Sequence, residues 1–255
     1  MILSIAVVCE KDLDMFTARD LADRVLVETI DWLDEEHLPD LRRWRGLGPQ
    51  ESCLLWTTVD KEAKARGIRI RGGFEAEESH QFDSRTARRA LILLSEIEPT
   101  PNAVVLIRDG DKQSEDRYPS LVNARNHAEN DYLEGTPIVI GFAHPMKECW
   151  ILAGFQPRPD SKEEPDRLAA LRQELGFDPT RHPERLTASD KNAKKSPKRV
   201  LEVLCGGDRN REQLCWKETH LNVLKARGKE TGLPEYLEEV KKRLVPLFEG
   251  RERSA

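Results

Sequence analysis

The chain has 255 residues, of which 34% are charged and 38% hydrophobic, as in a globular protein with a heavily charged surface. Its net charge of −5 is no signal for nucleic acid, and its five cysteines lack the spacing of a disulfide scaffold. No stretch reaches the roughly 18 apolar residues that a membrane span needs. We therefore expect reduced thiols, a cytoplasmic location and no membrane partner.

The first predicted element is a buried strand at residues 2–9, which Glu10 follows directly. These residues are mostly apolar, and no basic leader precedes them, so a strand is favoured over a signal peptide. A helical period comes next, with Thr17 as the expected N-cap and an end near Leu33. A strand, an acid and a helix in this order predict the start of a βα fold.

Residues 38–83 contain several proline and glycine residues, and we expect them to elaborate the first domain. Within them, residues 54–59 are predicted as a short strand and residues 66–73, which alternate charged and aliphatic side chains, as a half-exposed strand. Two interpretations stay open for the arginines of this segment, contact with phosphates or a solvated face. They are Arg42, Arg43, Arg45, Arg66, Arg69 and Arg71.

A helix is predicted from an N-cap at Ser84 to Glu98, where Pro99 ends it. The apolar residues 103–107 then predict a strand that is buried on both faces. A further helix is expected over residues 121–132, a buried strand over 137–143, and a short helix over 147–153. This alternation of strands and helices predicts an α/β fold with a largely parallel sheet flanked by helices.

Two aspartates, Asp109 and Asp111, follow the strand at 103–107, with Gly110 between them to allow a sharp turn. They would lie at the carboxyl end of a parallel strand, where open α/β sheets place their ligand sites. Two carboxylates so close repel each other unless a cation lies between them, and oxygen ligands favour Mg²⁺ or Mn²⁺. The alternative is an ordinary strand-ending turn.

The composition changes after residue 156, and we expect a domain at 1–156 and a mostly helical, partly basic extension at 157–255. Helices are predicted near residues 168–175, 200–204, 212–226 and 235–244. From Asp190 to Lys229 there are eleven lysines and arginines against five acidic residues. The densest basic stretch contains Lys191, Lys194, Lys195, Lys198 and Arg199.

Two motifs carry a family resemblance. Val7-Val8-Cys9-Glu10 with Asp14 four residues later, and the strand ending in Asp109-Gly110-Asp111, resemble the TOPRIM (topoisomerase–primase) domain of topoisomerases, primases and overcoming-lysogenization-defect nucleases. The strand at 137–143 and the helix after it are similar to small stand-alone TOPRIM-like proteins of bacteria, often found among phage-defence genes. The resemblance covers about residues 1–155, and Lys11 stands where a glycine commonly follows the glutamate.

This resemblance implies a compact α/β domain in which Asp109 and Asp111 hold Mg²⁺ or Mn²⁺. Glu10 would be a further ligand or a general acid and base. Asp14 and Glu148 are additional candidate ligands, although an acid in the first turn of a helix can instead serve the helix dipole. Lys112 would steady a phosphate or be an exposed loop lysine.

The expected activity is hydrolysis of DNA or RNA by a metal-dependent phosphodiesterase or nuclease, acting in bacterial antiviral defence. The basic stretch at 191–199 would bind the nucleic-acid backbone. The sequence has no Walker-type phosphate-binding loop, so a nucleotide-driven step would need a partner ATPase. The alternatives are a non-catalytic scaffold subunit of a defence complex and a small phosphotransferase acting on a nucleotide. Self-association is left open.

Overall fold

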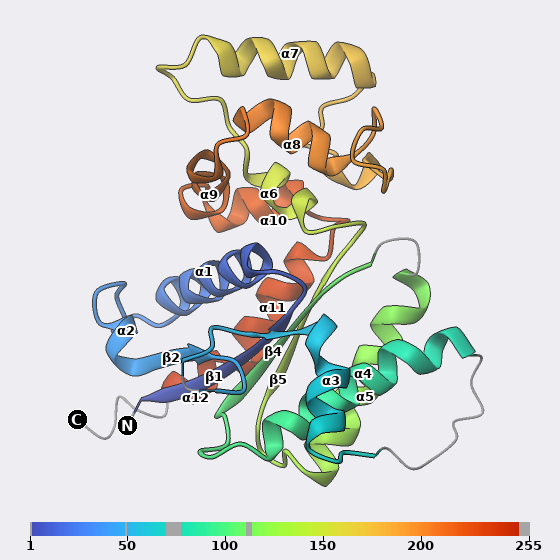
Figure 1. Ribbon diagram of the computed structural model, residues 1–255. Helices are drawn as coiled ribbons and strands as arrows, with labels where there is room; N and C mark the ends of the chain where they lie inside the picture. Colours follow the sequence, from blue (N-terminus) through green and yellow to red (C-terminus); the bar gives the residue numbers. More distant parts are fainter. Residues whose placement is uncertain (1, 49, 70–77, 111–113, 250–255) are drawn as a thin grey trace. The chain divides into compact units, whose positions relative to one another are not determined.

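The computed structural model describes residues 2–48, 50–69, 78–110 and 114–249 (Figure 1). Within these ranges the chain forms a mostly parallel five-stranded sheet flanked by helices, followed by a helical C-terminal part. The predicted α/β class is therefore confirmed. None of the helices in the described ranges combines the length and the hydropathy needed to span a bilayer.

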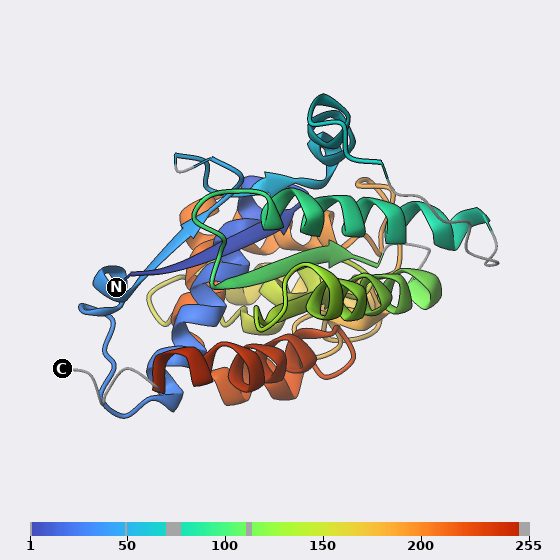
Figure 2. The same cartoon turned by 90° about the horizontal axis from the view of Figure 1, so that it is seen from below.

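The sheet has the order β2-β1-β4-β5, and β3 also pairs with β1. Strand β1 is parallel to β2, β3 and β4, and Figure 2 shows β2, β1 and β4 side by side. The apolar side chains of β1 and β4 are buried, as expected for parallel strands covered on both faces. The strand bounds are β1 Leu3–Cys9, β2 Arg42–Arg45, β3 Leu54–Leu55, β4 Ala103–Asp109 and β5 Ile138–Ala143.

The described residues form two compact units that do not follow the order of the chain. The first takes its residues from 1–108, 113–141 and 236–255, and the second from 109–112 and 142–235. The predicted division at residue 156 was sequential, whereas the structure returns the C-terminal helices to the first unit.

The first unit holds most of the sheet. Helix α1 packs along β1, and α3, α4 and α5 lie beside one another (Figure 1). The helices of this unit are α1 Asp12–Thr29, α2 Leu38–Leu41, α3 Trp56–Ala65, α4 Glu78–Ser95, α5 Ser114–Asp131, the greater part of α11 Leu233–Arg243, and α12 Val245–Glu249.

Tyr236 fixes α11 in the core of the first unit. Its ring is fully buried, and its hydroxyl donates a hydrogen bond to the Ala18 carbonyl in α1 at 2.7 Å. Gly141 in β5 makes room for the ring, since an added Cβ would lie 2.8 Å from Tyr236 Cδ2 and 2.4 Å from Ile107 Cδ1. Helix α11 is thus part of the α/β core. Two ion pairs also join it to α5, Arg125–Glu239 and Arg243–Glu129.

We expect the Tyr236→Phe substitution to lower the free energy of unfolding by about 1 kcal/mol, because it removes one buried hydrogen bond and keeps the ring. Urea denaturation measures this effect. Tyr118→Phe, at a side chain that is exposed, is the control and should change stability less. Equal stability of the wild type and Tyr236→Phe would show that this hydrogen bond contributes nothing.

Two predicted N-caps are wrong. Helix α1 begins at Asp12, and Thr17 lies inside it, where its hydroxyl donates to the Leu13 carbonyl at 2.9 Å. Acidic residues in the first turn favour the N-terminus of a helix, so the earlier start is reasonable. Ser84 likewise lies inside α4, which begins at Glu78 and ends at Ser95 rather than at Glu98.

The strand predicted at residues 54–59 is also wrong, since β3 spans Leu54–Leu55 and α3 begins at Trp56. The buried side chains of α3 are Trp56, Val59 and Ala63, which have helical spacing. Residues 66–69 of the second predicted strand are not in a strand. The rest of that prediction lies outside the described residues.

The second unit is built around α6 Glu148–Gly154, a short helix in which every residue from Cys149 on is buried. Helices α8, α9 and α10 all contact it. Gly154 permits close approach to α9, since an added Cβ would lie 2.0 Å from the Cys215 carbonyl oxygen. The other helices of this unit are α7 Glu163–Leu175, α8 Pro197–Cys205, α9 Arg209–Lys217 and α10 Leu221–Arg227.

The predicted helix at 212–226 is in fact two helices, because α9 ends at Lys217 and α10 starts at Leu221. In the break, the Thr219 hydroxyl donates to the Gly154 carbonyl at 2.6 Å. Helix α8 starts earlier than predicted, at Pro197, with Ser196 as its N-cap.

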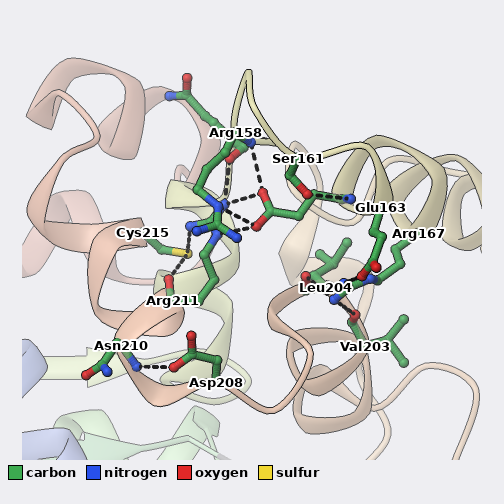
Figure 3. Close-up of polar contacts among 12 residues, drawn as sticks. Arg158, Ser161, Glu163, Arg167, Val203, Leu204, Asp208, Asn210, Arg211 and Cys215 are labelled. Atoms are coloured by element: carbon green, nitrogen blue, oxygen red, sulfur yellow. Dashed lines mark hydrogen bonds and ion pairs between the residues drawn. The ribbon is translucent and has the colours of Figure 1, made fainter.

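A buried ion-pair network joins the segment after α6 to α9 (Figure 3). The Glu164 carboxylate accepts hydrogen bonds from Arg211 Nε at 2.8 Å and Nη2 at 3.0 Å, and from Arg158 Nε at 2.9 Å. The Arg211 guanidinium also lies 4.6 Å from the centre of the Phe155 ring. Burial raises the pKa of Glu164, but the hydrogen bonds from both arginines outweigh it and lower the pKa to about 2.

The lowered pKa of Glu164 predicts acid sensitivity. Because its folded value lies below the ordinary 4.5, the stabilisation is fully present above about pH 4.5 and is lost as the pH falls towards about 2. Glu164→Gln cannot ionise, so the stability difference between wild type and Glu164→Gln should shrink over that range. Denaturant unfolding at several pH values measures the difference, and a pH-independent difference would contradict the prediction.

Candidate functional site

Glu10 follows β1 and has a cation as its partner. Its Oε1 lies 3.3 Å from Nη1 of Arg108, the residue directly before Asp109 in the chain. The Arg108 guanidinium lies 5.5 Å from the centre of the Trp56 ring, and Trp56 Nε1 donates to the Ile107 carbonyl at 2.7 Å. Arg108 and Trp56 were not predicted as site residues. Arg108 could have been found from its position, because it is a charged residue directly after the apolar residues 103–107.

Asp14 lies in the first turn of α1 and is buried. Its Oδ2 accepts a hydrogen bond from the Lys11 amide at 3.1 Å. This bond is the helix-terminal contact that the sequence offered as one of two interpretations, and the role of Asp14 as a metal ligand stays a prediction.

Asp109 is the last residue of β4, as predicted for the carboxyl end of a strand. Its Oδ1 accepts a hydrogen bond from the Lys147 amide at 2.8 Å, directly before α6. The Gly110 amide donates to the Ala143 carbonyl at 2.7 Å, which ties this strand end to the end of β5. The predicted partners Asp111 and Lys112 lie outside the described residues.

Glu148 begins α6, one residue after the amide that holds Asp109. Its Oε2 atom is buried and has no hydrogen-bond partner among the residues that the structure describes. A buried carboxylate oxygen without donors is costly, since the protein replaces none of its hydration. Lys147, directly before Glu148 in the chain, has only 3% of its surface exposed. The second unit thus links the Asp109 carboxylate at the end of β4 to the start of α6, where Lys147 and Glu148 follow one another in the chain.

Glu212 of α9 extends this group. Burial raises the pKa of Glu212, the Lys147 charge opposes this shift, and the Glu148 charge adds to it. We call Asp109, Lys147, Glu148 and Glu212 the acid–lysine cluster. Glu212 and Lys147 were not predicted as site residues, because no local pattern shows that α9 packs against α6.

The unpartnered oxygen of Glu148 beside Asp109 fits a bound cation, since hard oxygen donors suit Mg²⁺ or Mn²⁺. Within the described ranges, no group of three or more histidine, cysteine, aspartate or glutamate side chains is arranged to hold a metal ion. The predicted site of Glu10, Asp109 and Asp111 draws Glu10 from the first unit and depends on Asp111, which is not described. The metal site therefore stays a prediction.

The predicted nucleic-acid-binding residues differ in exposure. Lys191, Lys194 and Lys195 are exposed, whereas Lys198 and Arg199 are half-buried in the first turn of α8. Arg199 Nη2 lies 3.1 Å from Glu174, so its charge is already paired. Three lysines of this stretch thus remain directed to solvent.

Comparison with models of protein families, with curated proteins and with solved structures finds no match to this chain. The TOPRIM resemblance accordingly stays a prediction. The α/β fold with a mostly parallel sheet is of the class that the resemblance implies.

Proposed function

We propose that this chain is a metal-dependent phosphodiesterase that cleaves DNA or RNA. One observation carries the proposal: the Oε2 of Glu148 is buried without a hydrogen-bond partner among the described residues, and Glu148 follows the residue whose amide binds Asp109 at the carboxyl end of β4. The carboxyl ends of strands are where open α/β sheets bind ligands. Two acids that share such an edge with a buried lysine are suited to phosphoryl chemistry.

Asp109, Asp111 and Glu148 would hold Mg²⁺ or Mn²⁺, with Glu10 as a further ligand or general base. When bound, the ion would neutralise phosphate charge and stabilise the leaving oxygen. The Lys147 amide orients the Asp109 carboxylate through its hydrogen bond. The exposed lysines Lys191, Lys194 and Lys195 would attract the nucleic-acid backbone.

The proposal extends to the setting of the activity. The sequence resembles stand-alone TOPRIM-like proteins found among phage-defence genes, so we place this nuclease in antiviral defence. The sequence has no Walker-type loop, and a partner ATPase would supply any nucleotide-driven step.

A non-catalytic scaffold in a defence complex is the second candidate. The ion pair between Glu10 and Arg108 favours it, because the charge of this acid is already balanced by an arginine of the chain. Lys11, where the family commonly has glycine, points the same way.

One experiment separates the two functions. The purified chain is incubated with labelled single- and double-stranded DNA and RNA, with Mg²⁺, with Mn²⁺ or with a chelator. Cleavage that requires the metal supports the nuclease. If no polymer is cleaved, with or without the products of neighbouring genes, the nuclease proposal fails and the scaffold is favoured.

A further inference from the structure

Arginines gather at the turn that follows α7 in the second unit. Asp178 lies at the centre of this turn, and its Oδ2 accepts hydrogen bonds from Arg172 Nε at 3.0 Å and Nη2 at 2.6 Å. Arg181 Nε lies 3.8 Å from the same oxygen. The amide and hydroxyl of Thr180 donate to Oδ1 at 2.9 Å and 2.7 Å. The single carboxylate is therefore saturated.

Two more arginines complete the group. Arg227, at the end of α10, donates through Nη1 to the Phe155 carbonyl at 3.0 Å. Burial lowers the pKa of Arg227, the charges of Arg181 and Arg172 lower it further, and the Asp178 charge opposes the shift. The Arg185 guanidinium stacks on the Phe177 ring, 4.1 Å from its centre. We call Arg172, Arg181, Arg185 and Arg227 the arginine turn.

Positive charge on the arginine turn exceeds negative charge. Across the described residues, its ion pairs all go to the carboxylate of Asp178. Of the nearby acids, Glu174 pairs with Arg199 at 3.1 Å, and Glu184 lies 3.3 Å from His182, which is charged only when it is protonated. Even with the Glu184 charge counted, the four arginines outnumber the acids. Like charges held together are unfavourable, and an anionic partner would relieve the repulsion.

The arginines remain accessible to such a partner. The side chains of Arg172 and Arg181 are 49% and 69% exposed, and Arg185 is exposed above the buried Phe177 ring. A guanidinium binds a phosphate through two parallel hydrogen bonds. The outer face of a stacked guanidinium can also receive a nucleobase, which only an unpaired strand offers.

We propose that the arginine turn binds single-stranded nucleic acid, with Arg172 and Arg181 on phosphates and Arg185 under a base, while the half-buried Arg227 adds to the positive charge. This inference rests on the proposed function, for which it names the form of the substrate. It concerns residues outside the basic stretch at 191–199. Binding without metal tests it independently of cleavage.

The test is fluorescence anisotropy of labelled oligothymidine, oligouridine and a DNA duplex with the full chain in chelator. Arg181→Ala/Arg185→Ala should weaken binding of both single strands by about tenfold or more. The slope of log affinity against log salt should become shallower by about 0.7 for each phosphate that the variant no longer neutralises. Lys61→Ala/Lys64→Ala removes the same charge from exposed positions of α3 and is the matched control. Equal thermal unfolding of both variants would establish that each is folded.

The inference is overturned if Arg181→Ala/Arg185→Ala binds as the wild type does, if the control weakens binding as much, or if the duplex binds as tightly as the single strands. If the chain cleaves nucleic acid but Arg181→Ala/Arg185→Ala leaves its affinity unchanged, only the proposed binding by the arginine turn is refuted. A chain that binds through these arginines but cleaves nothing refutes the nuclease alone.

Discussion

Asp109→Asn is expected to lower metal-dependent cleavage by about a hundredfold or more, measured as the initial rate on the polymer that the wild type cleaves. The asparagine Oδ1 can still accept the hydrogen bond that the Lys147 amide donates at 2.8 Å, so the end of β4 should keep its geometry. The negative charge needed to hold a divalent cation is removed. The variant therefore separates the charge of this residue from its structural role.

Asp190→Asn is the matched control for this variant. Asp190 is exposed in the same unit and accepts a hydrogen bond from the Asn192 amide at 2.9 Å, so the substitution is equally conservative. It should leave cleavage unchanged. Glu148→Gln should lower cleavage as Asp109→Asn does, because it removes the charge of the unpartnered carboxylate. Wild-type cleavage by Asp109→Asn would remove this residue from the metal site.

Glu164→Ala is expected to lower the free energy of unfolding by about 3–5 kcal/mol, because it leaves the Arg211 guanidinium buried without its counter-charge. The side chains of Glu164 and Arg211 are only 2% and 5% exposed, and Arg211 keeps carbonyl and sulfur contacts that cannot neutralise it. Denaturant unfolding at neutral pH, with the slope compared between variants, measures the destabilisation.

Glu163→Ala is the control at the neighbouring position. Glu163 is 79% exposed and pairs with Arg167 within α7, an arrangement that contributes less than about 1 kcal/mol. If Glu163→Ala and Glu164→Ala lower the free energy of unfolding equally, burial is not the reason that the Glu164–Arg211 pair contributes to stability. A small effect of Glu164→Ala would indicate that water reaches Arg211 once the carboxylate is gone.

The sequence by itself determined the elements whose burial is continuous. Residues 103–107 and 137–143 are apolar on both faces, and they form the buried strands β4 and β5. The placement of Asp109 at the end of β4 followed from the same pattern. A parallel strand covered on both faces needs this unbroken hydrophobicity, so local composition is sufficient to identify it.

Local composition was insufficient where the same apolar residues fit both the period of a strand and the period of a helix. Residues 54–59 are compatible with a strand, but Trp56 and Val59 bury one face of a helix, and the Trp56 indole finds its acceptor at Ile107. The partner that decides between the two lies about fifty residues away in the chain. Short apolar segments are ambiguous in sequence for this reason.

Contacts between residues that are far apart in the chain could not be predicted from local patterns. Tyr236 reaches the Ala18 carbonyl across 218 positions of sequence, Glu10 pairs with Arg108, and the Lys147 amide binds the Asp109 carboxylate. No periodicity encodes these contacts, because each depends on how separate elements pack once the chain has collapsed. The sequence therefore determined the fold class and one edge of the candidate site. The burial of Lys147, the pairing of Arg108 with Glu10 and the position of α11 in the core depend on packing.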